Sequence, residues 1–175
     1  MTDLRESLMR FAPAGVALSL VLALSASVGQ SAPPQPLDPR AAALVAQGRA
    51  ALSGGNADGA IDAFEAALAI QPGATAITLD LADATRRQGL QGKALHYYRE
   101  ALERDPQNLT AISGEGAALV EKGAVEKAKR NLTRLQGLCG ESCAETRELA
   151  ALIARAGAAQ MVSADSVKAT PTATN

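Results

Sequence analysis

Two cysteines, Cys139 and Cys143, are the residues of this chain with the clearest capacity for chemistry. Such a pair admits three kinds of chemistry: a disulfide, a thiol that exchanges electrons, or a pair of thiolates that holds a metal ion. On one continuous helix, residues four apart hold their Cβ atoms ~5–6 Å apart, which exceeds the ~3.5–4.5 Å that a disulfide requires. A disulfide therefore needs a break in the helix between the two cysteines.

The sequence between the cysteines supplies such a break. Gly140 can end one helix, and Ser142 with Glu145 has the spacing of a capping box that begins another. An even number of cysteines in an oxidising compartment is first interpreted as a disulfide, and closing so small a loop is worth about 2 kcal/mol by chain entropy. We therefore predict a structural disulfide between Cys139 and Cys143, with a thiol-redox role and a metal site as the alternatives.

The sequence contains no residue pattern typical of hydrolysis, phosphoryl transfer or zinc catalysis. The chain has one histidine, His96, and lacks a glycine-rich phosphate loop and any cluster of His and Cys residues. Neighbouring acids such as Asp80 and Asp83 are typical of a solvated helix face. The 17 basic and 18 acidic residues are intermixed, so no electrostatic footprint for nucleic acid is present. We expect no enzyme activity, no cofactor, no resident metal and no nucleic-acid partner.

The two cysteines are expected to lie at the ends of helices. Between residues 41 and 155, apolar residues recur at helical spacing; Leu95, Tyr98, Ala101 and Leu102, for example, share one face of a helix. No segment alternates apolar and polar residues as a strand would. The sequence therefore predicts an all-α protein, built from Ala, Leu and Val because only 2% of the residues are aromatic.

A pattern of packing residues repeats at an interval of 34 residues. A small residue, an aromatic residue, a second small residue and a proline occur as Ala60, Phe64, Ala67 and Pro72, and again as Ala94, Tyr98, Ala101 and Pro106. The same register places small residues at Gly48, Ala82, Gly116 and Ala128, and turn glycines at Gly55, Gly89 and Gly123. Three units follow: 41–74, 75–108 and 109–142.

This pattern closely resembles the tetratricopeptide repeat. The resemblance implies a short right-handed superhelical solenoid of three helical hairpins over residues 38–157, closed by a capping helix over 143–157. It also implies a scaffold that binds peptides or proteins and performs no chemistry of its own. Asp38 is expected to cap the first helix, with Pro39 at the first helical position.

The third unit departs from the pattern. Leu132 replaces the aromatic residue, Leu135 the second small residue and Gly140 the proline. This unit is either degenerate or adapted to contact something other than a fourth repeat.

The resemblance also implies a concave groove lined by the first helix of each repeat. Its expected lining residues are Val45, Arg49, Leu79, Asp83, Arg86, Ser113 and Val120. Arg49 and Arg86 would give this groove a basic centre that pairs with an acidic segment or a terminal carboxylate. The alternative is that these arginines only keep the helices soluble. The Lys and Asn pattern by which some cytosolic relatives clamp a carboxylate tail is absent.

The spacing of Cys139 and Cys143 also resembles the copper-binding pair of certain exported copper chaperones. Those proteins have a strand-rich, thioredoxin-like fold and a distant histidine ligand, whereas His96 lies on a repeat helix with nothing to bring it toward Cys139. Thioredoxin-type redox sites use a two-residue separation within a βαβ pattern. The resemblance therefore supports only the alternative function, a thiol-redox or copper-handling accessory protein.

The N-terminal segment has the plan of a secretory signal. Arg5 and Arg10 precede an uncharged stretch over residues 11–28 that ends in small residues. We expect residues 1–30 to be a cleaved signal peptide, with an uncleaved membrane anchor as the alternative. Residues 31–37 are predicted to be a proline-rich linker and residues 158–175 a disordered tail.

These inferences combine into one functional hypothesis. The chain is expected to be a monomeric, non-enzymatic adaptor in the periplasm of a bacterial cell envelope, or anchored in the inner membrane and facing the periplasm. Its partner is a protein or peptide of unknown identity, and the resemblance suggests envelope assembly, secretion or pilus biogenesis as the process. Self-association through the exposed end of the solenoid is a third possibility.

Overall fold

The computed structural model describes residues 36–166, which form seven α-helices without a strand. The predicted all-α fold class is confirmed for this part of the chain. The expected signal segment 1–30 and most of the linker 31–37 lie outside the described residues, as do residues 167–175. None of the helices between residues 36 and 166 combines the length and hydropathy needed to cross a bilayer.

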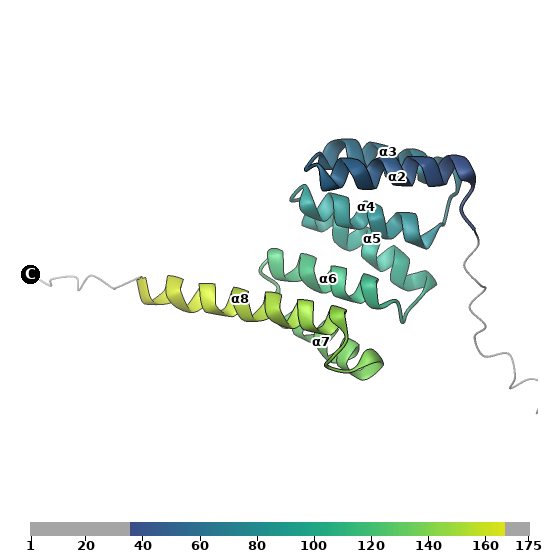
Figure 1. The fold of residues 1–175 in the computed structure, drawn as a ribbon. Helices are drawn as coiled ribbons and strands as arrows, with labels where there is room; N and C mark the ends of the chain where they lie inside the picture. Colours follow the sequence, from purple (N-terminus) through teal and green to yellow (C-terminus); the bar gives the residue numbers. More distant parts are fainter. Residues whose placement is uncertain (1–35, 167–175) are drawn as a thin grey trace, which may run out of the picture. The chain divides into compact units, whose positions relative to one another are not determined.

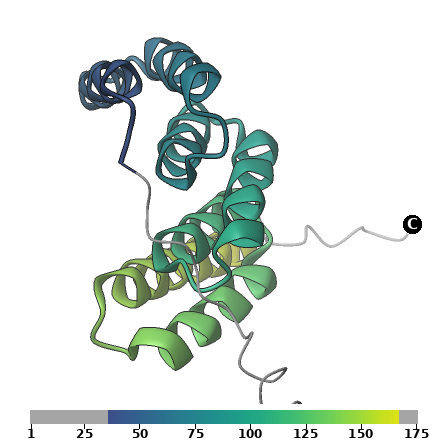
Figure 2. The same cartoon turned by 90° about the vertical axis from the view of Figure 1, so that its right-hand side faces the viewer.

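Six of the helices form three hairpins that stack in chain order, and the seventh lies against the last hairpin (Figures 1 and 2). The helices are α2 (Pro39–Ser53), α3 (Ala57–Ile70), α4 (Thr75–Arg87), α5 (Gln91–Arg104), α6 (Leu109–Glu121), α7 (Val125–Cys139) and α8 (Ala144–Ser166). Helix α8 packs against both α6 and α7, the position that the first helix of a fourth hairpin would take.

The turn inside each hairpin depends on a glycine. Gly55, Gly89 and Gly123 have φ angles of 80°, 87° and 81°, in the left-handed region where a side chain would be strained. Because these glycines recur every 34 residues, the helices α3, α5 and α7 that follow them begin with the same spacing.

Side-chain caps begin three of the helices. The Asp38 carboxylate accepts a hydrogen bond from the backbone N–H of Arg40 at 2.8 Å, and Pro39 occupies the first turn as predicted. This hydrogen bond holds the pKa of Asp38 below its usual value, although slight desolvation opposes the shift. Asn56 and Asn108 cap α3 and α6 by accepting hydrogen bonds from N–H groups three residues on, which the sequence analysis missed.

Small residues and a few large ones fill the core between the hairpins. Phe64 is fully buried against Gly48, where an added Cβ would lie 2.5 Å from the phenyl ring. The other expected packing residues that are fully buried are Ala60, Ala67, Ala82, Ala94, Ala101 and Ala128. Pro72 and Pro106 differ: both are exposed in loops, so they end helices and do not pack.

The third hairpin packs against α8. Leu149 of α8 is fully buried together with Ile112 and Leu135, and Leu132 lies beside this cluster. The third hairpin thus has leucines at the positions that hold an aromatic residue and a small residue in the first two hairpins. Its neighbour is the single helix α8, whereas the earlier hairpins are followed by another hairpin. Of the two interpretations of this unit, adaptation to a different neighbour is the one that fits the packing.

The bounds of α8 differ from the prediction at both ends. Helix α8 begins at Ala144, and the Cys143 carbonyl accepts the first helical hydrogen bond from Arg147, so the expected capping box of Ser142 and Glu145 does not start it. At the other end, the helix continues to Ser166, past the predicted boundary at residue 157. Apolar periodicity ends near residue 158, but Ala, Gln and Met favour a helix even without an apolar face.

Candidate functional site

A hollow of about 330 Å³ lies where α4, α6 and α8 meet. We call it the α4–α8 hollow. Its walls are formed by Leu79, Asp83 and Arg86 of α4, Tyr98 of α5, Thr110, Ser113, Gly114 and Ala117 of α6, and Ala144, Glu145, Glu148 and Leu152 of α8. The first helices of the second and third hairpins therefore face each other across it, with α8 closing one end.

Four of the seven residues expected in the groove are brought together in this hollow: Leu79, Asp83, Arg86 and Ser113. Val45 is not available, because it is 4% exposed and packs in the core with Leu81 and Ala84. Val120 lies outside the hollow and packs against two of the apolar clusters. The expected groove is thus wrong at Val45 and shorter than the sequence suggested.

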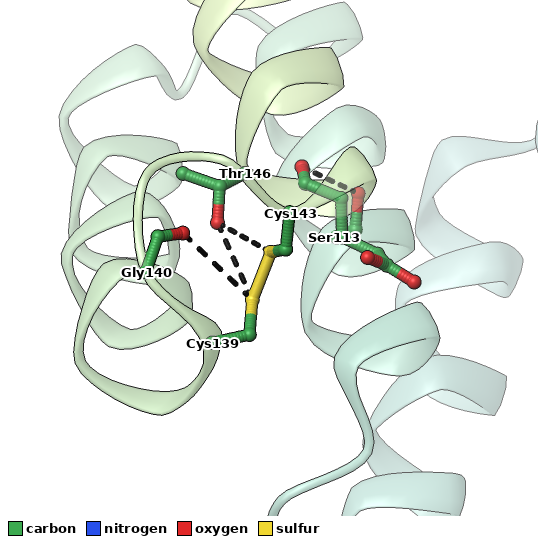
Figure 3. Close-up of a disulfide and its surroundings, with 6 residues drawn as sticks. Ser113, Cys139, Gly140, Cys143 and Thr146 are labelled. Carbon is green, nitrogen blue, oxygen red and sulfur yellow. Dashed lines mark hydrogen bonds between the residues drawn. A yellow bond between two sulfur atoms is a disulfide. The ribbon is translucent and has the colours of Figure 1, made fainter.

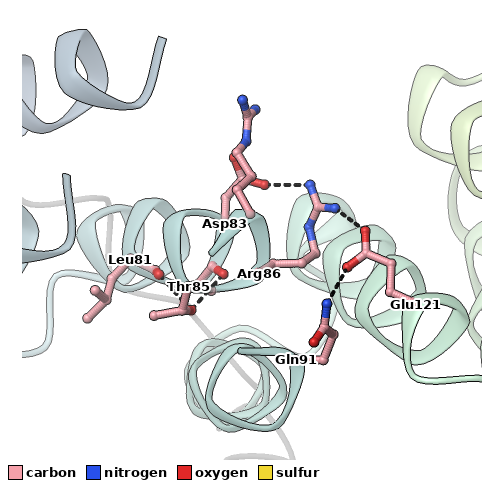
Figure 4. A network of polar contacts seen from close by, with 8 residues as sticks. Leu81, Asp83, Thr85, Arg86, Gln91 and Glu121 are labelled. Atoms are coloured by element: carbon pink, nitrogen blue, oxygen red, sulfur yellow. Dashed lines mark hydrogen bonds and ion pairs between the residues drawn. The ribbon is translucent and has the colours of Figure 1, made fainter. Parts of the chain in front are cut away.

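Arg86 is held by acidic side chains from two helices (Figure 4). It donates hydrogen bonds to Asp83 of its own helix, at 2.7 Å, and to Glu121 of α6. Glu121 also accepts a longer hydrogen bond from Gln91, and Asp83 accepts one from Arg87 at 2.8 Å. The charge of Arg86 is therefore already matched within the protein.

The protonation of Arg86 follows from the same contacts. Burial opposes its charge, but the hydrogen bond and negative charge of Asp83, together with the charge of Glu121, outweigh burial and raise the pKa of Arg86 above its ordinary value. Its Nε–H group is buried and has no hydrogen-bond partner among the described residues. Arg86 thus acts as a fixed cation that joins α4 to α6.

Arg49 is paired as well. Its guanidinium contacts both carboxylate oxygens of Asp80, with the shortest distance 2.7 Å from Nη2 to Oδ2, and so joins α2 to α4. Neither arginine supplies the unpaired basic centre that the sequence analysis expected. The sequence could not show the pairs between helices, because Asp80 lies 31 residues from Arg49 and Glu121 lies 35 residues from Arg86.

The wall contributed by α8 was missed by the sequence analysis. Glu145 and Glu148 lie at this wall and form no ion pair with any side chain in the described part of the chain. The Ser113 hydroxyl donates to the backbone carbonyl of Glu145 at 3.4 Å, which ties the wall to α6. Extending the 34-residue register by one unit would have placed Ala144 at a groove position and so indicated this wall.

Tyr98 forms the floor of the hollow. It is 3% exposed, and its ring lies against Gly114, where an added Cβ would be 2.3 Å from Cε1. Burial raises the pKa of Tyr98 to about 12, and the negative charge of Asp83 adds to this effect while Arg86 opposes it. A residue predicted only for packing between repeats thus also reaches the candidate site.

The two cysteines lie at either end of the loop that joins α7 to α8 (Figure 3). Their Cα atoms are 5.9 Å apart and their sulfur atoms 2.01 Å apart, which places them as a disulfide. Gly140, with φ 83°, ends α7 and provides the break that this geometry needs. The Thr146 hydroxyl is 2.9 Å from the sulfur of Cys143. Formation of the bond in the protein's own compartment stays a prediction.

Glu145 gives the metal alternative a third possible ligand. One of its carboxylate oxygens and both cysteine sulfurs lie within 4.8 Å of one another. These groups could bind a metal ion only after the sulfurs are reduced, because a disulfide lacks the thiolates that a metal requires.

A second hollow, of about 380 Å³, has the opposite charge. It lies between α5, α6 and α7, and its walls carry the basic residues Arg99, Lys122 and Lys127. The residues that line the two hollows thus differ in net charge, because the first hollow has three carboxylates and one guanidinium.

Comparison with known proteins agrees with this architecture. Residues 79–108 match the sequence profile of a family described as tetratricopeptide repeat. No curated protein sequence matches the chain. Residues 79–108 therefore match one tetratricopeptide repeat, and the fold of the described residues is that of a tetratricopeptide-repeat solenoid.

Solved structures with the same fold include three repeat domains of similar size. The first such domain of Spaghetti, bound to an HSP90 peptide, is 24% identical, with a TM-score of 0.60 over 70% of this chain and 99% of that one. The Sgt2 domain from Aspergillus fumigatus is 24% identical, with a TM-score of 0.62 over 82% of this chain and 93% of that one. The TPR2B domain of yeast Sti1, in complex with pHsp70, is 17% identical, with a TM-score of 0.63 over 70% of this chain and 99% of that one.

Proposed function

We propose that this chain is a non-enzymatic scaffold that holds a segment of a partner protein in the α4–α8 hollow. The observation that carries the proposal is the position of this hollow, where the first helices of two adjacent hairpins and α8 converge with polar and apolar side chains on the same surface. Ligand sites of this mixed character suit a peptide, which presents both a polar backbone and apolar side chains.

Two of the similar structures support this proposal, because their domains were solved with HSP90 or Hsp70 partners. The partner of this chain should differ from theirs. The Lys and Asn pattern expected of a carboxylate clamp is missing, and both candidate arginines are paired within the protein. We therefore propose a protein or peptide partner without a carboxylate-tail anchor.

The proposed place of action is the bacterial cell envelope. It rests on the signal-like composition of residues 1–30 and on the cysteine pair, which suits an oxidising compartment. Export would place the repeats in the periplasm, either free or tethered by an uncleaved segment. Envelope assembly, secretion or pilus biogenesis are the processes in which we propose to search for the partner.

A test is crosslinking in the native compartment with a variant that fills the hollow. Ser113→Trp places an indole between α4 and α8, whereas Ser53→Trp adds the same group at the exposed end of α2 as a matched control. If the proposal is right, the wild type and Ser53→Trp capture the same partners, and Ser113→Trp does not capture them. Capture of the same partners by both variants would show that the hollow is not the binding site.

The alternative function, thiol-redox or copper handling, uses Cys139, Cys143 and the neighbouring carboxylate of Glu145. Intact-mass measurement of protein taken from the native compartment tests it and also reports whether residues 1–30 have been removed. A pair that is fully oxidised and resists mild reductant would eliminate this alternative.

A further inference from the structure

We infer that the disulfide between Cys139 and Cys143 regulates the α4–α8 hollow. The oxidised chain holds the α8 wall in its binding position, and reduction loosens this wall and weakens partner binding. This regulation rests on the proposed function and concerns the same site. It differs from the thiol-redox alternative, because the electrons change the shape of a binding site and are not passed on to a substrate.

The disulfide and the α8 wall are adjacent in the chain. Cys143 directly precedes α8, and the next two residues, Ala144 and Glu145, both line the hollow. The disulfide joins Cys143 to Cys139, the last residue of α7, across residues 140–142. The covalent bond therefore fixes where the first turn of α8 starts relative to α7.

Polar groups of this first turn surround the sulfur atoms (Figure 3). Thr146 is 2% exposed, and its hydroxyl lies 2.9 Å from Sγ of Cys143 and 3.6 Å from Sγ of Cys139. A carboxylate oxygen of Glu145 lies within 4.8 Å of both sulfurs. Disulfide sulfurs only accept hydrogen bonds, whereas thiols also donate them. Reduction therefore places two new donors beside Glu145, a residue that lines the hollow.

Buried contacts keep α8 attached to the stack without the disulfide. Leu149 is fully buried together with Ile112 and Leu135. Nearer the cysteines, the wall is tied to α6 by the Ser113 hydroxyl, which donates to the Glu145 carbonyl at 3.4 Å, a long hydrogen bond. Reduction therefore loosens the first turn of α8 and leaves the rest of the helix in place.

The chemical step is thiol–disulfide exchange with a dithiol protein. Both cysteines are only half-buried, so a thiolate of the dithiol can reach them. It attacks Sγ of Cys139, the bond to Cys143 breaks, and the Thr146 hydroxyl stabilises the departing sulfur of Cys143. The second thiol of the dithiol then displaces Cys139. Two electrons and two protons pass to the cysteine pair, and the dithiol becomes a disulfide.

Amide hydrogen exchange of the full chain, followed residue by residue by NMR, tests the structural part. The amide of Arg147 donates the first helical hydrogen bond of α8, to the Cys143 carbonyl, and should exchange about tenfold or more faster after reduction with dithiothreitol. The amide of Ala42 is the matched control, since it donates to the Asp38 carbonyl as the equivalent bond of α2 and should change less than about twofold. Cys139→Ser with Cys143→Ser should exchange like the reduced wild type and ignore the reductant.

Photocrosslinking in the native compartment tests the effect on binding. A benzophenone side chain replaces Glu148 at the hollow, and the same group at the exposed Ser53 of α2 gives the background. With the cysteine pair intact, the hollow should capture its partner. Cys139→Ser with Cys143→Ser should lower this capture about fivefold or more.

Four results would overturn the regulation. These are a pair that excess dithiothreitol leaves oxidised, an Arg147 amide that reduction leaves unchanged, an equal rise in exchange at Arg147 and Ala42, and equal partner capture with and without the cysteines. The proposed function is judged separately, by Ser113→Trp in the chain with both cysteines. Capture that Ser113→Trp abolishes and the double-serine change leaves intact would uphold the scaffold and reject the switch.

Discussion

Leu149 of α8 packs directly over Gly116 of α6. A Cβ added at Gly116 would lie only 2.5 Å from Cδ2 of Leu149. Leu149 is also fully buried. The missing side chain at Gly116 therefore sets how near α8 approaches the last hairpin. Since α8 carries one wall of the hollow, this contact links the packing of the stack to the shape of the candidate site.

Replacing Gly116 by alanine should lower the free energy of unfolding by about 1–3 kcal/mol, because the added methyl group overpacks the contact with Leu149. Urea denaturation measures the change. Gly137→Ala is the control: it lies in α7 with open space around it, and should raise the free energy of unfolding by about 0.5–1 kcal/mol through helix propensity. A Gly116→Ala variant as stable as the wild type would contradict the close packing of α8.

Replacing Arg86 by methionine should lower the free energy of unfolding by about 1–3 kcal/mol, because Asp83 and Glu121 would lose the cation between them. Arg49→Met provides the comparison. The side chain of Arg49 is 61% exposed, so its pair with Asp80 should contribute less than about 1 kcal/mol. Equal losses in the two variants, measured by urea denaturation, would show that burial does not strengthen the Arg86 contacts.

Replacing both cysteines by serine should lower the free energy of unfolding by about 2 kcal/mol, the chain-entropy value for so short a loop. Thermal denaturation of oxidised protein, with and without a phosphine reductant, measures the effect. Reductant should lower the melting temperature of the wild type and leave the double-serine variant unchanged. If the reductant frees the thiols of the wild type but leaves its melting temperature unchanged, the disulfide does not stabilise the contact between α7 and α8.

Tyr98 should make stability fall at high pH. Its pKa rises from 10.0 to about 12 on folding, so the unfolded chain loses the tyrosine proton first. The stability from this group is complete below pH 10 and is lost as the pH rises toward 12, by about 2–3 kcal/mol. Tyr98→Phe should remove this part of the pH dependence, which urea denaturation at pH 9, 10 and 11 can resolve. If the free energy of unfolding depends on pH in the same way in the wild type and in Tyr98→Phe, Tyr98 is not the source of the loss of stability.

The fold could be predicted because its determinants repeat. Phe64 and Tyr98 occupy equivalent places, and glycines such as Gly89 mark turns that need a left-handed backbone, so each unit supports the assignment of the next. Local signals of this kind can be recognised in a single sequence without an alignment. The neighbours of the last hairpin do not repeat, and its leucine cluster with α8 became visible only in three dimensions.

The candidate site was only partly predictable. Val45 and Leu79 have the same position in their repeats, yet Val45 is buried against α4 while Leu79 lines the hollow. The difference comes from which helix covers each residue. Likewise, the charge that Arg86 presents depends on Glu121 from the following hairpin. A pattern of residue types along one helix cannot reveal what a neighbouring helix neutralises.

The position of α8 has a consequence for how this protein can diversify. One wall of the hollow belongs to a helix that is outside the repeats and follows a short loop after Cys139. Substitutions on that face of α8, such as at Glu148, leave the contacts between hairpins untouched. Related chains could therefore acquire different ligands by changing a single terminal helix, while the three hairpins continue to fold as before.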